Sequence, residues 1–308
     1  MSRAVLIRPV ALGAFLLCFF VVVMGAYVRL SAAGLSCPDW PGCYGHVSPA
    51  GMAEAGKAWK EMIHRYAAAT LGVLILVLVT LVIQTRKERL VSLPYAAGLL
   101  VLVVTQGLLG MLTVTRLLEP LIVTAHLLLG MSTLAMLWWL LLTLGRRELS
   151  AWRGTPAFLG SSLPRTRQLA LLALAALALQ LALGGWTSSH YAATGCPDLP
   201  KCQGQWWPGL QSGSAALIHY THRLGAVVAT ALLVLASTRV LLSRSDHFAR
   251  LAATAVLAAL VVQLSIAVAM VLSGFPLWLA TAHNAGAALL LLAVLALNRS
   301  LRPVWQAP

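Results

Sequence analysis

Long runs of uncharged, apolar residues constrain this sequence more than any other feature. Five runs cover residues 9–28, 66–85, 90–115, 120–145 and 168–189, each near or above the roughly 20 residues that cross a bilayer as a helix. A sixth covers 224–242. The last run, 251–298, is too long for one crossing, and its Ser-Gly-Phe-Pro turn signal at 273–276 divides it in two. Because a helix satisfies its own backbone hydrogen bonds in lipid, the sequence predicts an all-α integral membrane protein with eight transmembrane helices.

The placement of positive charge predicts the orientation of these helices. Only 10% of the residues are charged, against about 25% in soluble proteins, and the net charge is +14. Of the 22 Lys and Arg residues, 15 fall in 3–8, 86–89, 146–167, 239–250 and 299–302. The positive-inside rule therefore places both termini in the cytoplasm. No basic patch with interleaved aromatic residues is present, so nucleic acid is excluded as a partner.

Four motifs occur twice, in the same order and 157–159 residues apart. They are Cys-Pro-Asp-x-Pro-x-Cys-x-Gly at 37–45 and 196–204, His-Arg at 64–65 and 222–223, glutamine at 106 and 263, and Thr-Ala-His at 124–126 and 281–283. The pattern predicts two four-helix bundle halves, 1–145 and 168–308, joined by a cytoplasmic linker at 146–167. Each half crosses the membrane an even number of times, so we expect parallel rather than inverted repeats.

Four histidines recur within these motifs. His64, His126, His222 and His283 each lie near the start of a helix that runs inward from the outer face. Two imidazoles at matching depth on neighbouring helices are what a bis-histidine haem needs, because haem iron has two axial positions. We therefore predict one haem site in each half. The alternatives are hydrogen-bonded interfacial histidines, or zinc, for which the cysteine spacing is wrong.

Three further residues accompany these histidines. Arg65 and Arg223 directly follow a histidine, and such arginines either bind haem propionates through a bidentate fork or extend toward the membrane surface. Glu61 lies three residues before His64, on the same helix face, whereas the matching position in the second half is His219. A carboxylate there either moves protons or is an acid favoured by the helix dipole.

Four of the five cysteines lie in loops that the predicted orientation places outside, as the pairs Cys37/Cys43 and Cys196/Cys202. An oxidising compartment permits disulfides, and each pair can close a local bridge if its Cα atoms come within about 7 Å. Both a structural cap and a redox role stay open. Cys18, inside the first apolar run, is expected to be a small packing residue.

Taken together, Glu61-x-x-His64-Arg65, the two cysteine loops, His222-Arg223 and both Thr-Ala-His motifs resemble the haem A synthases of the Cox15/CtaA family. The resemblance covers essentially the whole chain. It implies an enzyme that oxidises the ring D methyl group of haem O to a formyl group, by successive hydroxylations and loss of water. The product, haem A, serves terminal oxidases.

The resemblance also implies roles for individual residues. His222 and His283 would ligate a resident haem b in the C-terminal half. His64 and His126 would surround the substrate haem in the N-terminal half, and Glu61 would be the carboxylate needed for turnover. Bacterial members that carry a cysteine pair in the first outer loop match Cys37/Cys43.

A bacterial plasma membrane is the implied location. Haem O, the lipid bilayer, a haem O synthase and an electron donor are the implied partners, and a homo-oligomer stays open. One rival interpretation is a di-haem b electron-transfer subunit linked to quinol, which leaves the difference between Glu61 and His219 unexplained. A second rival is a transporter, although transporter repeats usually frame a site at the membrane midplane.

Overall fold

The computed structural model describes residues 3–49, 55–153, 164–243 and 245–302. Eight helices in this part of the chain are long and apolar enough to cross a membrane, which confirms the predicted all-α membrane protein. They are α1 (Ile7–Leu30), α2 (Ala55–Gln84), α3 (Leu93–Thr115), α4 (Pro120–Arg153), α5 (Pro164–Ser189), α6 (Ser214–Leu242), α7 (His247–Leu272) and α8 (Leu277–Ser300). Short 3₁₀ helices cover Arg3–Leu6, Arg86–Glu88, Ala192–Gly195 and Leu210–Ser212.

Local sequence explains several helix boundaries. Asp246 caps α7 by accepting a hydrogen bond from the backbone N–H of Ala249 at 2.7 Å. Prolines open α4 and α5, where their missing N–H costs nothing. Gly274 adopts φ = +72° between α7 and α8, a conformation that favours glycine, so the turn signal within the last apolar run does separate two helices.

Two helices begin well before the apolar runs that predicted them. Helix α2 starts at Ala55 rather than near residue 66, and α6 starts at Ser214 rather than near residue 224. An apolar run marks the part of a helix that suits hydrocarbon, whereas polar turns can extend the same helix beyond it. The additional turns of α2 and α6 carry Glu61 and His219.

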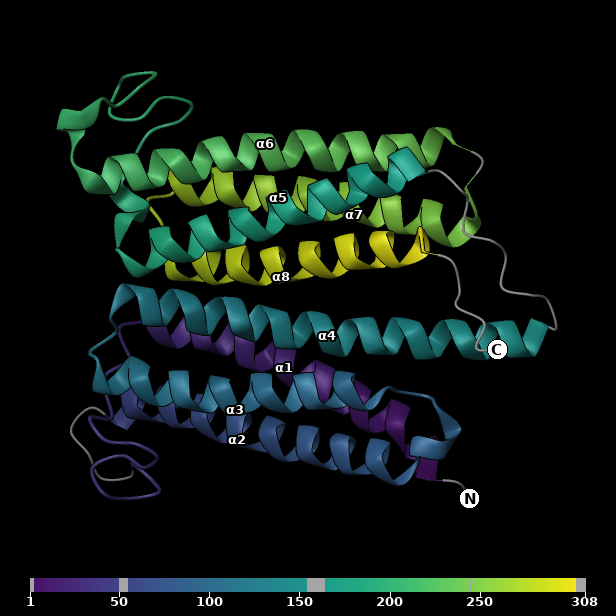
Figure 1. Ribbon diagram of the computed structural model, residues 1–308. Helices are drawn as coiled ribbons and strands as arrows, with labels where there is room; N and C mark the ends of the chain where they lie inside the picture. The colour runs from purple at the N-terminus through teal and green to yellow at the C-terminus, as the bar shows by residue number, and fades with distance from the viewer. Residues whose placement is uncertain (1–2, 50–54, 154–163, 244, 303–308) are drawn as a thin grey trace. The chain divides into compact units, whose positions relative to one another are not determined.

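The chain divides into two units, Met1–Leu141 and Leu142–Pro308. In the first, α1 packs against α2 and α2 against α3. The hydroxyl of Tyr95 on α3 donates to the backbone carbonyl of Met136 on α4, and Phe15 on α1 stacks on Trp138 of α4 with ring centroids 5.2 Å apart. These contacts close a four-helix ring, and the α1–α2 and α3–α4 connections lie at the same end of it (Figure 1).

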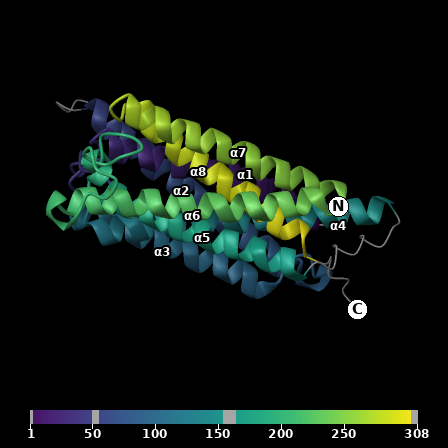
Figure 2. The same ribbon diagram turned by 90° about the horizontal axis from the view of Figure 1, so that it is seen from above.

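The second unit closes in the same way. Helix pairs α5–α6, α6–α7, α7–α8 and α5–α8 are in contact, and Figure 2 shows α6, α7 and α8 side by side. The amide of Asn298 on α8 donates to the backbone carbonyl of Ala170 on α5 at 3.1 Å. Leu233, Val256 and Val294 are fully buried within this unit. Large apolar side chains such as Val227 and Val261 are exposed on its outside, as expected for helices that face lipid.

The parallel-repeat arrangement and the predicted boundaries at 145/146 and 167/168 stay predictions. Within the predicted linker, residues 146–153 continue α4 and residues 164–167 begin α5, while 154–163 lie outside the described residues. Among the basic loop residues that suggested the orientation, Arg244 also lies outside them.

Candidate functional site

The N-terminal unit carries one of the histidine pairs, His64 on α2 and His126 on α4. The His64 ring lies against α1, where a Cβ added at Gly25 would come within 2.9 Å of its Cε1 atom. The His126 ring lies against α3 at Gly110, with 3.6 Å to the corresponding Cβ position. In both rings Nδ1 is buried without a hydrogen-bond partner.

The C-terminal unit holds the second pair, His222 of α6 and His283 of α8. The His222 ring lies against α5, where a Cβ added at Gly184 would come within 3.0 Å of its Cε1 atom. The two rings differ from the N-terminal pair because each meets a glutamine amide. Gln180 of α5 lies 3.0 Å from Nδ1 of His222, and Gln263 of α7 lies 3.1 Å from Nδ1 of His283.

Each histidine pair stands on diagonally opposite helices of a four-helix ring, not on adjacent ones. Adjacent helix axes are about 8–10 Å apart, so the diagonal is roughly 11–14 Å by geometry. Bundles commonly build cofactor sites in this central space, from side chains that face one another. Among the described residues, no three or more His, Cys, Asp or Glu side chains gather to hold a metal ion. The candidate ligands in each unit are therefore the two imidazoles on its diagonally opposite helices.

Each unit has one loop closed by a disulfide, before α2 in the first unit and before α6 in the second. Cys37–Cys43 has its Cα atoms 4.7 Å apart, and Cys196–Cys202 has them 4.6 Å apart. All four cysteines are buried. Both predicted pairings are therefore confirmed. Cys18 is buried and free, as expected for a packing residue.

An aspartate organises each disulfide loop. The carboxylate of Asp39 accepts hydrogen bonds from the backbone N–H groups of Tyr44 and Gly45 at 2.6 and 2.7 Å. Asp198 does the same for Gln203 and Gly204 at 2.6 and 2.8 Å. The bond from the glycine N–H is the largest cause that lowers the pKa of each carboxyl below its ordinary value. These aspartates were visible in the repeated motif, but sequence reasoning gave them no role.

Arg65 ties the first disulfide loop to α2. Its guanidinium donates to the backbone carbonyls of Asp39 at 2.8 Å, of Pro41 and Cys37 at 3.3 Å, and of Gly42. Neither expectation for this arginine, propionate binding or extension to the membrane surface, anticipated such a cluster of carbonyls. Arginine suits this role because its rigid fork presents five N–H donors.

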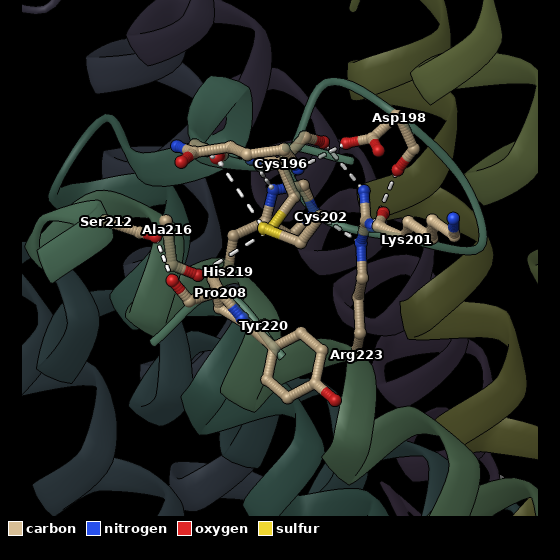
Figure 3. The surroundings of a disulfide bond; sticks show 12 residues. Cys196, Asp198, Lys201, Cys202, Pro208, Ser212, Ala216, His219, Tyr220 and Arg223 are labelled. Carbon is tan, nitrogen blue, oxygen red and sulfur yellow. Dashed lines mark hydrogen bonds between the residues drawn. A yellow bond between two sulfur atoms is a disulfide. The ribbon is translucent and has the colours of Figure 1, made fainter. Parts of the chain in front are cut away.

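Arg223 repeats the arrangement on α6. It donates to the carbonyls of Asp198, Lys201 and Cys196 at 2.8, 2.9 and 2.7 Å. Figure 3 shows this guanidinium beneath the loop, next to the disulfide. In both units, therefore, the residue that follows a histidine fixes the loop above that histidine's helix.

Glu61 and His219 occupy matching places in the two units. Oε2 of Glu61, which is only 4% exposed, accepts from the backbone N–H of Cys37 at 3.0 Å, and Oε1 pairs with Arg65. Nδ1 of His219 lies 3.3 Å from the backbone N–H of Cys196, and Nε2 lies 3.3 Å from the Arg223 guanidinium. A neutral imidazole has one acceptor nitrogen, so it accepts one of these two hydrogen bonds. Thus one unit places a carboxylate, and the other an imidazole, in the same hydrogen-bonding position.

Comparison with known proteins agrees with these observations. The family model for COX15-CtaA, described as cytochrome oxidase assembly protein, matches residues 8–295. A protein named heme A synthase from Shewanella oneidensis is 38% identical, over 90% of this chain and 91% of its own length. Proteins of the same name from Caulobacter vibrioides and Symbiobacterium thermophilum are 29% and 30% identical, over 92% and 74% of this chain and 93% and 73% of their own lengths. With eight apolar helices, duplicated histidine pairs and a family match along nearly its whole length, this chain belongs to the COX15-CtaA family.

Proposed function

We propose that this protein is a haem A synthase, a membrane enzyme that converts haem O to haem A by oxidising the ring D methyl group to a formyl group. Its relatives carry the name heme A synthase. The observation that carries the proposal is the presence of two histidine pairs, one in each unit, with different surroundings. The Nδ1 atoms of His64 and His126 have no hydrogen-bond partner, whereas His222 and His283 each meet an amide. The buried Glu61 lies one turn before His64 on α2.

The residues of each unit fit a haem. The donor set is two imidazoles on diagonal helices, and histidine is a common protein ligand of haem iron, so each pair would hold a haem between its helices. Gly25 and Gly184 let a ring lie directly against the neighbouring helix, because a Cβ at either position would come within 3.0 Å of the imidazole. The His64 ring thereby packs directly on the backbone of α1, and the His222 ring on the backbone of α5. A buried, unpartnered Nδ1, as in His64 and His126, is unusual in a protein interior and supports a role for these rings in binding.

In this proposal, His222 and His283 hold the resident haem b, which supplies electron-transfer chemistry when bound. His64 and His126 receive haem O and orient it within the N-terminal unit. Glu61 is on the same helix as His64 and one turn before it. Its carboxylate already accepts hydrogen bonds from Cys37 and Arg65, but a carboxylate has about four lone-pair sites, so it keeps capacity to accept a proton.

The disulfide loops complete the proposed sites as caps. Arg65 and Arg223 fasten them to the helices that carry His64 and His222, so they restrict the entry of water at that end. The distribution of basic residues supports an orientation with both termini in the cytoplasm and with the caps at the outer face of a bacterial plasma membrane. The successive hydroxylations that we propose consume reducing equivalents, and haem O is itself a biosynthetic product, so an electron donor and a haem O synthase are the partners we propose.

The proposal is tested by incubating the purified, membrane-extracted protein with haem O, a reductant and dioxygen as the oxidant for the two hydroxylations, followed by mass spectrometry of the extracted haems. We expect a product with the mass of the formyl derivative, formed in proportion to enzyme and time. A di-haem electron-transfer subunit would bind haem b at both sites and leave haem O unchanged, and that result would refute the proposal.

A further inference from the structure

Both rings of the C-terminal histidine pair are held by a glutamine from the preceding helix. The Gln180 amide nitrogen lies 3.0 Å from Nδ1 of His222 and donates to the His222 backbone carbonyl at 3.0 Å. The Gln263 amide nitrogen lies 3.1 Å from Nδ1 and 3.4 Å from Nε2 of His283, and it donates to the His283 backbone carbonyl at 3.1 Å. Each amide therefore contacts its histidine at the ring and at the backbone, which fixes the ring relative to its helix.

Glycines make room for these amides. A Cβ added at Gly225, one turn after His222, would come within 2.3 Å of Oε1 of Gln180. A Cβ at Gly286, one turn after His283, would come within 2.2 Å of Oε1 of Gln263. An amide offers a donor and an acceptor that exchange places when its terminal bond rotates. When Nδ1 carries a proton, the rotated amide would accept from it through Oε1. It would then give up the bond to the backbone carbonyl, because the amide nitrogen makes both contacts here.

The N-terminal pair lacks this support. Gln106 of α3 donates to the backbone carbonyl of His126 at 3.0 Å, but Nδ1 of His126 has no hydrogen-bond partner. The counterpart of Gln180, 159 residues earlier, is Val21. His64 meets the backbone of Val21 on α1 rather than a side-chain amide, and its Nδ1 is likewise without a hydrogen-bond partner.

We propose that Gln180 and Gln263 are positioning residues that fix the ring planes of His222 and His283 for a permanently bound haem. His64 and His126 have no such amide at their rings, and we infer that this difference lets the N-terminal site admit a substrate haem and release the product. Groups that hydrogen-bond the second nitrogen of a ligating histidine orient the ring and strengthen binding. This inference rests on the proposed function, because it assumes one resident and one exchanging haem.

The test replaces each glutamine by methionine, which has similar length and no hydrogen-bonding amide. Purified Gln180→Met and Gln263→Met holoproteins are mixed with excess apomyoglobin, a haem acceptor, and the transfer of haem b is followed by absorption. We expect transfer to be about 10–100-fold faster than in the wild type. The electron paramagnetic resonance spectrum of the ferric haem should also shift, because it depends on the orientation of the axial imidazole planes.

Gln106→Met is the matched control, because its amide reaches only a backbone carbonyl; it should retain haem b like the wild type. Gln180→Glu keeps an acceptor oxygen at the same reach and should fall between wild type and Gln180→Met. The inference would be overturned if Gln180→Met and Gln263→Met had the same haem transfer rates and the same spectra as Gln106→Met. Should one methionine variant fail to accumulate, the other, on a different helix, decides the question.

Val21→Gln tests the second half of the inference by adding an amide beside His64. We expect more haem O or haem A to co-purify with this variant, and unchanged co-purification would contradict the claim that the missing amide permits exchange. These readouts measure haem retention and not formyl production. The wild-type protein could fail to make haem A while both methionine variants still lose haem b faster. That combination would refute the proposed function and leave the positioning role intact.

Discussion

The backbone N–H of Cys37 donates a 3.0 Å hydrogen bond to Oε2 of Glu61, 24 residues further along the chain. The other carboxylate oxygen pairs with Arg65, which also donates to the Cys37 carbonyl. The proposed catalytic carboxylate and the disulfide loop therefore form one hydrogen-bonded unit. A change at Glu61 consequently has two separable effects, one on proton transfer and one on the loop.

Glu61→Gln separates these effects. The glutamine oxygen can still accept from Cys37, but it cannot act as a base, so formyl production should fall about 10²–10⁴-fold while haem b remains bound. Mass spectrometry of the product and the absorption spectrum measure the two quantities. Glu61→Ala should be as inactive and should also loosen the loop. Wild-type turnover in Glu61→Gln would show that the carboxylate serves only to hold Cys37.

Arg65→Lys should loosen the first loop without removing positive charge. A lysine ammonium cannot reproduce the fork that reaches four carbonyls, and each lost hydrogen bond to a charged group costs about 1.5–3 kcal/mol. Hydrogen–deuterium exchange of the peptide containing Tyr44 and Gly45 should accelerate. Arg223→Lys is the control, because it should accelerate exchange only in the second loop. Unchanged protection in both variants would contradict the clamp.

Replacing Cys37 and Cys43 together by serine removes the covalent closure but leaves Arg65 and Asp39 in place. Closing so short a loop stabilises the folded form by about 2–3 kcal/mol, so we expect a lower unfolding temperature with haem b still bound. Thermal unfolding, followed by haem absorption, measures this loss of stability. Turnover of the double serine variant is compared with turnover of His64→Ala and His126→Ala. Loss of turnover as complete as in those histidine variants would instead assign the disulfide a chemical role.

The hydrogen bonds that Asp39 and Asp198 accept within the two disulfide loops should be insensitive to pH until acid conditions are reached. The pKa of Asp39 and of Asp198 lies below the ordinary 3.8, chiefly because Gly45 and Gly204 donate backbone hydrogen bonds to the carboxylates. A lowered folded-state pKa contributes stability that is present above 3.8 and is lost as pH falls through the folded value. Amide exchange corrected for its intrinsic rate should therefore show constant protection from pH 7 to about 4.

Asp39→Asn provides the control for that pH dependence. It offers one acceptor oxygen where the carboxylate offers two, so protection of Tyr44 and Gly45 should be lower and should not change on acidification. Protection in the wild type that already falls near pH 6 would contradict the assignment to these carboxylates.

Much of the fold was readable from the sequence because lipid imposes a simple rule: long apolar runs become helices. The repeated motifs likewise predicted both disulfides, since a loop of five residues between cysteines leaves few other partners within reach. The beginning of α2 at Ala55 was missed, because polar residues can continue a helix beyond hydrocarbon without any apolar signal.

The hydrogen bonds of Arg65 and Gln180 could not be predicted in this way. These hydrogen bonds depend on how neighbouring helices and loops pack. The sequence indicates that packing only indirectly, through residues such as recurring glycines. One clue was present: Gly25 and Gly184 recur 159 residues apart, and both let a histidine ring approach the adjacent helix. A recurring glycine on a predicted helix indicates such close approach, and it would have identified α1 and α5 as the supports of His64 and His222.

The most direct measurement of the central claim, that the two histidine pairs have different tasks, is pyridine haemochrome analysis of purified His222→Ala and His64→Ala proteins after incubation with haem O. His222→Ala should lose resident haem b, whereas His64→Ala should retain haem b and accumulate no haem A. Equal haem b content in the two variants and the wild type, with haem A formed by all three, would contradict the account.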